Sequence, residues 1–197
     1  MIKVGITGGI GSGKSYISSM FEKLGVPVYY SDIRAKELMN TSEQVKQQLI
    51  STFGAETYKN NQLDRKYLAE IVFNNEEKLE LLNNIVHPAV KNDYKKWCSE
   101  HQNYPYTLKE AALLFETGIY KELDKTILVH ASKDIRILRV MQRDKVSKQA
   151  VEARMDKQMD DFAKMDLADY IVHNDGINEV FKIVEKLHTL FNPSIAI

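Results

Sequence analysis

The eight residues at positions 8–15, Gly-Gly-Ile-Gly-Ser-Gly-Lys-Ser, constrain the fold of this chain more than any other stretch. They match the P-loop pattern G-x-x-x-x-G-K-[ST] in full. The preceding residues, 2–7, form a short segment rich in β-branched side chains, which predicts a buried strand. Residues 16–24 follow with apolar side chains at helical spacing. Strand, glycine-rich loop and helix in this order are the arrangement that binding a nucleotide phosphate requires.

The residue types of this loop suit a phosphate group. Glycines let the backbone approach an anion without Cβ clashes, and successive N–H groups can then form an anion-binding nest. The first turn of the following helix adds further N–H donors and the positive end of its dipole. Lys14 supplies a mobile positive charge for the β- and γ-phosphates, and Ser15 offers a hydroxyl to Mg²⁺. The alternative is a glycine-rich turn that carries Gly-Lys-Ser by coincidence.

Composition restricts the class of protein. Lys and Arg total 27 and Asp and Glu total 27, so the net charge is zero, which argues against nucleic acid or a membrane surface as the main partner. The apolar runs are far too short for a membrane span, the chain enters a strand without a signal peptide, and the single Cys98 suits a reducing compartment. We therefore expect a cytoplasmic protein with one domain, 1–197, as a monomer or weak homo-oligomer.

Strand and helix patterns alternate along the chain, which predicts a parallel sheet with right-handed crossovers. The expected class is α/β, a three-layer P-loop NTPase fold with a five-stranded parallel sheet, an inserted helical substrate subdomain and a helical lid. Ligands of such a sheet bind at the carboxyl ends of the strands. The predicted strands are 2–7, 26–30, 106–116, 124–130 and 169–173, and the predicted helices outside the inserted block are 16–24, 33–39, 41–53, 134–143, 147–159 and 178–191.

Residues 61–101 carry helical patterns and no strand signal, which predicts the inserted subdomain. Asp64 is expected to cap one helix, and residues 75 and 76 to open the next. The dipeptide 87–88, His-Pro, is expected to interrupt that helix, with the proline in the first turn of a resumed helix. The strand predicted at 106–116 is rich in Ala and Leu, which also favour helices; turn signals on both sides favour a strand.

A few charged residues decide what a P-loop protein does. Asp32 follows the second predicted strand, where a carboxylate could accept a proton from an acceptor hydroxyl or hold Mg²⁺ through water; it could also simply cap a helix. Arg139 and Arg143 share one helix face, and Arg154 follows in the next helix. The segment 134–159 is therefore a candidate lid whose arginines stabilise charge on the transferred phosphoryl group, although arginines on such helices can equally be solvated.

A set of short stretches runs in order along the chain: 5–15, Asp32 with Ala35, 53–54, 63–65, 71–73, 86–88, 113–116, 143–144 with Arg154 and Gln158, 168–170 and 174–176. Taken in this order, they resemble the dephospho-coenzyme A kinase family along nearly the whole chain. The stretch 5–15 alone is moderately specific, whereas the ordered set is highly specific.

The resemblance implies roles for individual residues. Asp32 would be the general base for the ribose 3′-hydroxyl of dephospho-CoA, and Lys14, Arg139 and Arg143 would act on the phosphates of ATP, with Mg²⁺ as cofactor. Asn174 stands where the family's adenine contact is expected. The residues implied in binding the ATP phosphates are Gly11, Ser12, Gly13, Lys14, Ser15 and Tyr16.

The resemblance also implies that the block 61–101 receives the substrate dephospho-CoA, through Arg65, His87 and Lys91. For His87 the alternative is a packed residue at a helix break. Glu116, placed at the end of the predicted strand, would orient the substrate or a metal-bound water, or would pair with a nearby cation.

The chain departs from the family pattern at two positions. The family usually has Asp-Ala-Asp where this chain has 30–32, Tyr-Ser-Asp, so Tyr30 replaces the first acidic residue and the role of that carboxylate is in doubt. Ala112 replaces a proline, which we expect to alter local backbone stiffness. The rival functions are another small-molecule kinase of the nucleoside-monophosphate type and a nucleotide-dependent switch. A GTPase would be expected to carry an N-K-x-D motif, and the sequence has none.

Overall fold

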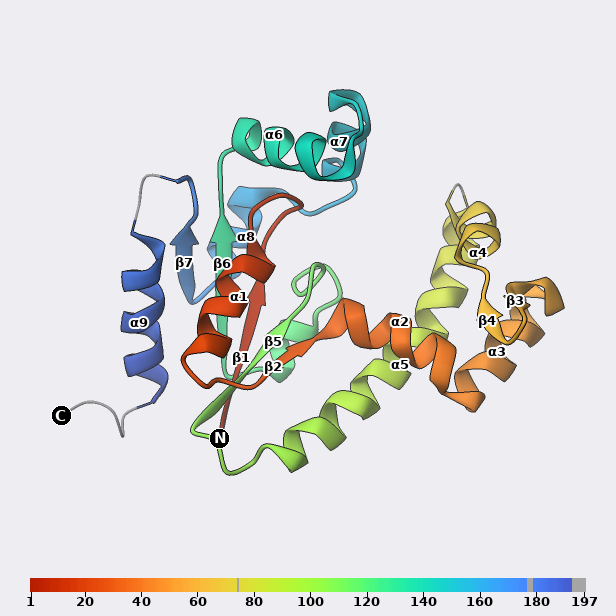
Figure 1. Ribbon diagram of the computed structural model, residues 1–197, viewed down its shortest axis with the longest axis horizontal. Helices are drawn as coiled ribbons and strands as arrows, with labels where there is room; N and C mark the ends of the chain where they lie inside the picture. Colours follow the sequence, from red (N-terminus) through yellow and green to blue (C-terminus); the bar gives the residue numbers. More distant parts are fainter. Residues whose placement is uncertain (74, 177–178, 193–197) are drawn as a thin grey trace. The chain divides into compact units, whose positions relative to one another are not determined.

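The computed structural model describes residues 1–73, 75–176 and 179–192. The chain divides into two compact units (Figure 1). The first, called the P-loop unit, comprises 1–30 and 101–197, and the second, called the helical unit, comprises 31–100. Each has a hydrophobic core of its own.

A five-stranded parallel sheet forms the centre of the P-loop unit, which confirms the predicted fold class. The strand order is β2-β5-β1-β6-β7, so the strand that leads into the P-loop lies in the middle of the sheet. The bounds are β1 Ile2–Thr7, β2 Val28–Tyr30, β5 Tyr106–Glu110, β6 Lys125–His130 and β7 Tyr170–His173.

Helices cover both faces of this sheet and complete a three-layer arrangement (Figure 1). Helices α1, Lys14–Lys23, and α9, Val180–Phe191, pack against each other over one face; residue 178 of the predicted last helix lies outside the described residues. Side chains alternate across a strand, and the core below α1 and α9 takes every second residue of β1 and β5. Helix α8, Asp161–Leu167, contacts β6.

The loop between α1 and β2 shows how local sequence fixes an element boundary. Gly25 has φ of 82°, a left-handed conformation that favours glycine, and it follows the last residues of α1. Its N–H donates to the carbonyl of Glu22 at 2.9 Å, and the N–H of Val26 donates to that of Phe21 at 3.1 Å. This pair of hydrogen bonds is a Schellman motif, which satisfies the last carbonyls of the helix.

Strand β5 ends at Glu110, so the prediction of a strand through Glu116 was wrong. The segment 111–118 is a series of turns, and Leu114 and Phe115 in it are buried. A Cβ on Gly5 would lie 2.7 Å from a methyl group of Leu114, so the side chain of Leu114 packs directly against β1. The apolar run continues past the strand because it covers the sheet instead of extending it.

Between α7 and β7, the described residues form a helix, α8, that the sequence did not predict. Helix α6 is Lys133–Asp144 and α7 is Lys148–Met155, so α7 ends before the predicted residue 159. The unpredicted helix α8 begins after Asp160, whose carboxylate accepts a hydrogen bond from the N–H of Phe162. The two acidic residues 160 and 161 are an N-cap signal that marks this short helix.

The helical unit packs its helices around a core of Val45, Leu49, Phe53 and Leu68. Ser42 and Asp64 cap α3 and α4 by accepting hydrogen bonds from N–H groups of the first turns, as the sequence predicts for Asp64. The bounds are α2 Ser31–Thr41, α3 Glu43–Phe53, η1 Ala55–Thr57, β3 Tyr58–Lys59, β4 Gln62–Leu63, α4 Arg65–Val72 and α5 Glu76–Glu100; η2, Ile119–Glu122, belongs to the P-loop unit.

Two predictions for the helical unit were wrong. Helix α5 continues through Pro88, although a proline there removes one backbone hydrogen bond. Its buried residues, Val86, Val90, Tyr94 and Cys98, recur every four positions across the proline, so one continuous apolar stripe holds both halves in helical register. The short hairpin β3–β4 was not predicted; its turn residues Asn60 and Asn61 have φ of 50° and 64°, the conformation that hairpin turns need.

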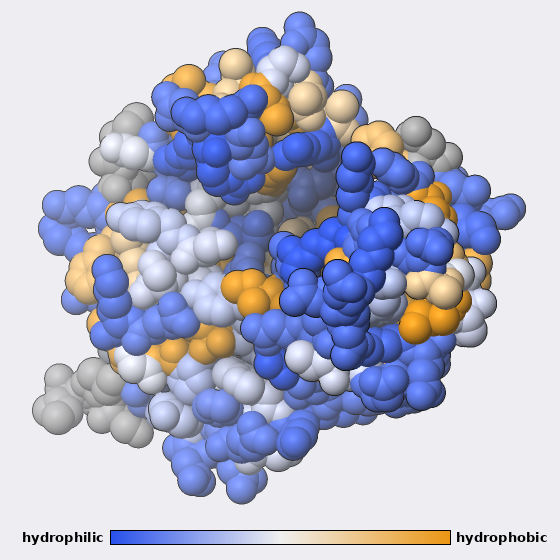
Figure 2. Space-filling model, turned by 45° about the vertical axis from the view of Figure 1, so that its right-hand side comes forward, coloured by the Kyte–Doolittle hydropathy of each residue, from blue (hydrophilic) through white to orange (hydrophobic). Residues whose placement is uncertain are grey.

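Within the described residues, no helix combines the length and apolar character that crossing a membrane requires. The face shown in Figure 2 is mostly hydrophilic, and its hydrophobic side chains lie in small separate groups.

Candidate active site

The P-loop, residues 8–15, connects β1 to α1 and contains two glycines with left-handed backbone conformations. Gly11 has φ of 81° and Gly13 has φ of 95°. A Cβ on Gly11 would lie 2.5 Å from the carbonyl oxygen of Arg136, and one on Gly9 would lie 2.2 Å from that residue's guanidinium. The glycines therefore serve both the turn of the loop and the close approach of its neighbours.

Hydrogen bonds from distant elements fix this loop. The buried side chain of Asn174 donates from Nδ2 to the carbonyl of Ser12 at 2.8 Å. The N–H of Ile10 donates to Oε1 of Gln158 at 2.8 Å, and Nε of Arg136 donates to the carbonyl of Ile10 at 2.9 Å. These hydrogen bonds satisfy two carbonyls and one amide of the loop and so fix its conformation.

Arg136 lies at the centre of these contacts and was not predicted from the sequence. It is 5 % exposed, and its guanidinium forms an ion pair with Asp161 in the first turn of α8. A buried charge is tolerated when it is paired and hydrogen-bonded, and Arg136 has both a carboxylate and a backbone carbonyl as partners. This arginine therefore joins α6, α8 and the P-loop.

Lys14 and Glu110 form an ion pair beside the loop. The distance from Lys14 Nζ to Glu110 Oε1 is 3.6 Å, and both side chains are largely buried. Glu110 is the last residue of β5, the strand next to β1, and sequence reasoning did not select it because it took this strand to continue to residue 116. A lysine and a carboxylate therefore stand together where the nucleotide phosphates are expected.

The first turn of α1 follows directly on the loop. Gly13 is the N-cap residue, and Lys14, Ser15 and Tyr16 occupy the first turn. Because the first N–H groups of a helix lack partners within the helix, this end presents donors and positive potential to an anion. The predicted phosphate-binding residues 11–16 thus run without interruption from the end of the loop into the first turn of α1.

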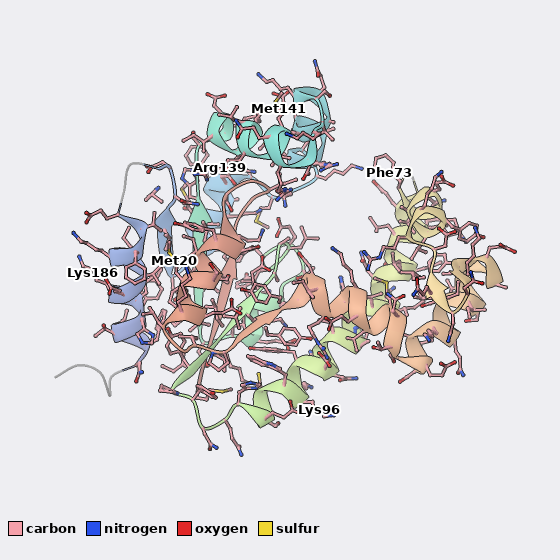
Figure 3. All side chains as sticks on the ribbon, viewed as in Figure 1. Met20, Phe73, Lys96, Arg139, Met141 and Lys186 are labelled. Carbon is pink, nitrogen blue, oxygen red and sulfur yellow. The ribbon has the colours of Figure 1, made fainter. Side chains whose placement is uncertain are left out.

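The helix pair α6–α7 packs on the tip of the P-loop. Ile10 lies against a small core of Ile137, Val140 and Val151. Arg139, labelled in Figure 3, points its guanidinium toward the carbonyls of Gly11 and Ser12, at 3.5 and 3.4 Å. The contacts place the predicted arginine Arg139 at the loop.

Arg143 has a different environment from Arg139. Its guanidinium donates to both oxygens of Asp144, at 2.7 and 3.1 Å, and Arg154 donates to the same carboxylate at 2.8 Å. The hydrogen bond from Arg143 is the main cause that holds the pKa of Asp144 at about 2. The structure thus brings Arg143 and Arg154 together on one acidic residue and leaves both arginines partly exposed.

Asn174 was predicted as an adenine contact, and the structure places it below the P-loop. Its backbone N–H donates to the carbonyl of His130 at 2.7 Å, and its side-chain amide holds Ser12 as described above. Its position directly after β7 brings this side chain to the loop. An adenine contact by this residue stays a prediction.

Glu116 lies in the turns after β5, not at a strand end. One of its oxygens, Oε1, is 2.9 Å from Nζ of the fully buried Lys164 and accepts a hydrogen bond from the N–H of Met159 at 3.1 Å. This is the cation pairing that the sequence left open as an alternative. Glu116 thereby connects the turns that follow β5 to α8. A role of Glu116 toward the substrate stays a prediction.

In the helical unit, Asp32 is an exposed residue in the first turn of α2, two residues after β2 ends. The next turn of the same helix is anchored, because Arg34 donates from Nε and a terminal nitrogen to the two oxygens of Asp93 on α5, at 2.9 and 2.6 Å. Such a bidentate pair is geometrically specific. Helix α2 therefore presents Asp32 from a position fixed within its unit.

The predicted substrate residues of the helical unit lie on two helices. Arg65 is the first residue of α4, and His87 and Lys91 are four residues apart on α5, on the same side of that helix. All three are exposed.

Comparison with known proteins decides the family. The family model described as dephospho-CoA kinase matches residues 2–179. The chain belongs to the dephospho-CoA kinase family. The dephospho-CoA kinase of Bacteroides fragilis (strain YCH46) is 34 % identical over 197 residues, with 96 % of each chain covered. That of Fusobacterium nucleatum subsp. nucleatum is 38 % identical over 185 residues, covering 93 % of this chain and 95 % of the relative.

A solved structure agrees with this assignment. The dephospho-CoA kinase from Campylobacter jejuni superposes with a TM-score of 0.72 at 28 % identity and covers 98 % of both chains. The fold, the P-loop and the family resemblance drawn from the sequence are thereby confirmed.

For this dephospho-CoA kinase family member, the donor set at the loop fits Mg²⁺. The hydroxyl of Ser15 and the carboxylate of Glu110 are hard oxygen ligands, which Mg²⁺ prefers. No three His, Cys, Asp or Glu side chains gather into a metal-binding group in the part of the chain that the structure describes. A few protein oxygens suit Mg²⁺ bound mainly by nucleotide phosphates and water, as P-loop enzymes bind it.

Proposed function

We propose that this chain transfers the γ-phosphoryl group of ATP to the ribose 3′-hydroxyl of dephospho-CoA, giving coenzyme A and ADP. The observation that carries the proposal is the family match along residues 2–179, which includes a P-loop held by hydrogen bonds from three other segments. In the transfer, the 3′-oxygen bonds to the γ-phosphorus while the bond from that phosphorus to the β–γ bridging oxygen breaks. ADP leaves, and the hydroxyl proton needs an acceptor.

Asp32 is the proposed proton acceptor. Its exposed carboxylate lies in the first turn of α2, two residues after β2 ends. The anchoring of α2 to α5 through Arg34 and Asp93 supports a positioned rather than a freely moving base. The alternative, a purely structural acidic residue at a helix start, predicts no effect on turnover.

Lys14 and Arg139 are proposed to act on the phosphates. Lys14 is held beside the loop by Glu110, and Arg139 is held over the carbonyls of the loop. Their positive charges would stabilise the charge that spreads over the transferred group. Arg143 would join them when its pairing with Asp144 is exchanged for a phosphate. Mg²⁺, when bound near Ser15, supplies charge neutralisation at the β- and γ-phosphates.

The helical unit is proposed to bind dephospho-CoA. Arg65, His87 and Lys91 present cationic or hydrogen-bonding side chains to solvent, which suits a substrate that carries a pyrophosphate. The helix pair α6–α7 is proposed as the lid that excludes water from the phosphoryl transfer. We propose a monomer or weak homo-oligomer, and neither nucleic acid nor a membrane as partner.

The decisive experiment supplies the purified protein with ATP, Mg²⁺ and one acceptor at a time. Dephospho-CoA, AMP, CMP and shikimate are the acceptors, and products are identified by mass. We expect coenzyme A and ADP in equal amounts with dephospho-CoA and no phosphorylated product with the others. ADP release that is independent of any acceptor would favour the nucleotide-dependent switch, and phosphorylation of AMP or CMP would favour a nucleoside-monophosphate kinase.

A second measurement tests the base. Asp32→Asn should lower kcat by roughly a hundredfold or more, because the amide cannot take the proton, while the affinity for ATP stays unchanged. Glu43→Gln is the matched control, since Glu43 is an exposed acidic residue in the first turn of the next helix. Turnover of Asp32→Asn within a few-fold of the wild type would remove Asp32 from this role.

A further inference from the structure

We propose that the imidazoles of His130 and His173 form a binding site for a divalent transition-metal ion such as Zn²⁺. Neither side chain belongs to the candidate active site described above, and neither was predicted as a site residue from the sequence. This second site does not depend on the proposed kinase activity, because it needs no nucleotide.

The sheet places the two histidines opposite each other. His130 ends β6 and His173 ends β7, and the two residues are in register in the parallel ladder, at the arrowheads of these strands in Figure 1. Because side chains alternate across a strand, both point to the face opposite the core residues Val129 and Val172. Strand β7 is at the edge of the sheet, and His173 is exposed whereas His130 is half-buried. An ion from solvent can therefore reach the pair.

A nitrogen atom of each ring faces the other ring. Nδ1 of His130 lies 3.3 Å from Nδ1 of His173, and the ring planes are at 82° with centroids 5.3 Å apart. Without a metal, one Nδ1 carries a proton and donates it to the lone pair of the other. Bonds from zinc to imidazole nitrogen are about 2.0–2.1 Å long, so nitrogens 3.3 Å apart subtend about 105–110° at a zinc ion. This angle is close to tetrahedral, so the pair has the spacing of two neighbouring zinc ligands.

The surroundings of His130 favour its neutral form and a nearby cation. A ligating imidazole must be neutral, and burial lowers the pKa of His130. Besides His173, the charged groups that act on His130 are the carboxylates of Asp161 and Asp175 and the guanidinium of Arg136. The sum of these three charges is negative, which favours a metal cation at the pair.

Backbone hydrogen bonds hold the two ligands in place. Besides the ladder between β6 and β7, the N–H of Asn174 donates to the carbonyl of His130 at 2.7 Å, directly after His173. Ligands carried by strands are positioned more precisely than ligands on loops. Imidazole suits Zn²⁺, Cu²⁺ and Ni²⁺ and not Mg²⁺.

The pair supplies two of the four positions of a tetrahedral ion. Among the described residues, no group of three or more His, Cys, Asp and Glu side chains is arranged to hold a metal. Water would therefore occupy the other positions, in contrast to a structural zinc site, which has four protein ligands. We accordingly expect an ion that exchanges with solvent and that a chelator removes without unfolding the protein.

The experiment is a calorimetric titration of the metal-free, full-length protein with ZnCl₂ in the absence of nucleotide. We expect one Zn²⁺ per chain in the wild type and at least about tenfold weaker binding in His130→Gln and in His173→Gln. Glutamine keeps a hydrogen-bonding group at each position but removes the imidazole ligand. His101→Gln is the matched control, because the ring of His101 lies beside Tyr104 in the same unit and should not contribute.

Two further measurements identify the ligands. Long-range ¹H–¹⁵N spectra of the histidine rings should show Zn²⁺ shifting the Nδ1 signals of His130 and His173 and leaving those of the other histidines unchanged. Wild-type affinity for Zn²⁺ should fall at least about tenfold from about pH 7.5 to about pH 5.5, because protons then compete for both nitrogens. Thermal unfolding shows whether each variant is folded, and Zn²⁺ should raise the Tm of the wild type only.

Each outcome decides the proposal. Equal Zn²⁺ affinity in the wild type and both variants, no measurable binding, or shifts confined to other histidines would leave the pair as a hydrogen bond only and overturn the site. If His130→Gln does not fold, the exposed position decides through His173→Gln. The acceptor assay for dephospho-CoA is independent of these results, so either proposal can fail alone.

Discussion

At Gly13 the backbone φ is 95°, and a Cβ there would lie 2.2 Å from Nδ2 of Asn174. The first value places the residue in the left-handed region, which costs a residue with a side chain about 1–2 kcal/mol. The second means that any side chain displaces the amide that holds the carbonyl of Ser12. Two independent physical reasons thus require glycine at this position.

Gly13→Ala should therefore destabilise the protein by about 2 kcal/mol or more, because the backbone strain adds to the loss of a buried hydrogen bond. It should also weaken ATP binding, since the loop that presents its N–H groups shifts. Chemical denaturation and calorimetry measure the two effects.

Gly25→Ala is the matched control for this change. Gly25 has φ of 82°, but nothing lies within 4 Å of the position of a Cβ, so only the backbone strain of about 1–2 kcal/mol applies and ATP affinity is unchanged. Equal effects of the two substitutions on stability and on ATP affinity would show that the contact with Asn174 is unimportant.

At the scale of elements, α6 carries several of the contacts that join the P-loop to the rest of its unit. Arg136 bonds to the carbonyl of Ile10, lies against Gly9 and pairs with Asp161 of α8. Ile10 in turn packs into the core between α6 and α7. Hydrogen bonds and apolar packing therefore join the loop tip directly to α6.

Arg136→Ala should destabilise the protein by about 3 kcal/mol, because it leaves Asp161 without its partner and a backbone carbonyl without its donor. Asp161→Asn should cost less, since Arg136 then keeps its bond to Ile10. ATP affinity should fall about tenfold in Arg136→Ala as the loop loses a fixed conformation. Denaturant unfolding and ATP titration measure these effects.

Lys133→Ala serves as control, because Lys133 is an exposed cation at the start of the same helix. Its removal should change neither quantity. A larger loss of stability in Asp161→Asn than in Arg136→Ala would contradict the claim that Arg136 stabilises the protein through both Asp161 and the carbonyl of Ile10.

Elements with local signals could be predicted from the sequence. The P-loop with its flanking strand and helix, the cap at Asp64 and the glycine that ends α1 each depend on a few consecutive residues. The predictions of element bounds were wrong where tertiary packing, and not local sequence, determines where an element ends. The apolar run after Glu110 covers the sheet instead of extending β5, and the buried stripe of α5 overrides the tendency of Pro88 to end a helix.

The same distinction holds for the candidate site. Lys14 and Ser15 were predicted, because a motif of consecutive residues contains them. Arg136 and Glu110 reach the loop through the tertiary fold, from α6 and β5, and no motif of consecutive residues contains them. The alternation of Tyr106, Leu108 and Glu110 on one face of β5 is the one signal that could have led to Glu110.

At the scale of the whole molecule, the chain forms two units with separate cores and passes between them at two places, after Tyr30 and after Glu100. The P-loop and the arginines near it belong to the first unit, whereas Asp32 and the proposed substrate residues belong to the second. Units with separate cores open locally with different free energies. Each proposed ligand should therefore stabilise the unit that binds it.

Hydrogen exchange read by mass spectrometry tests this division. AMP-PNP with Mg²⁺ should slow exchange in segments 8–15, 106–110 and 133–144, and dephospho-CoA alone should slow exchange within 31–100. A ligand at a hundred times its Kd stabilises the state that binds it by about 2.7 kcal/mol, which corresponds to roughly hundredfold slower exchange where opening requires release of the ligand.

Arg65→Ala should reduce the protection by dephospho-CoA and leave that by AMP-PNP intact, because Arg65 lies in the helical unit. Protection of the P-loop unit alone by dephospho-CoA would place its binding site outside 31–100 and would remove the proposed role of the helical unit.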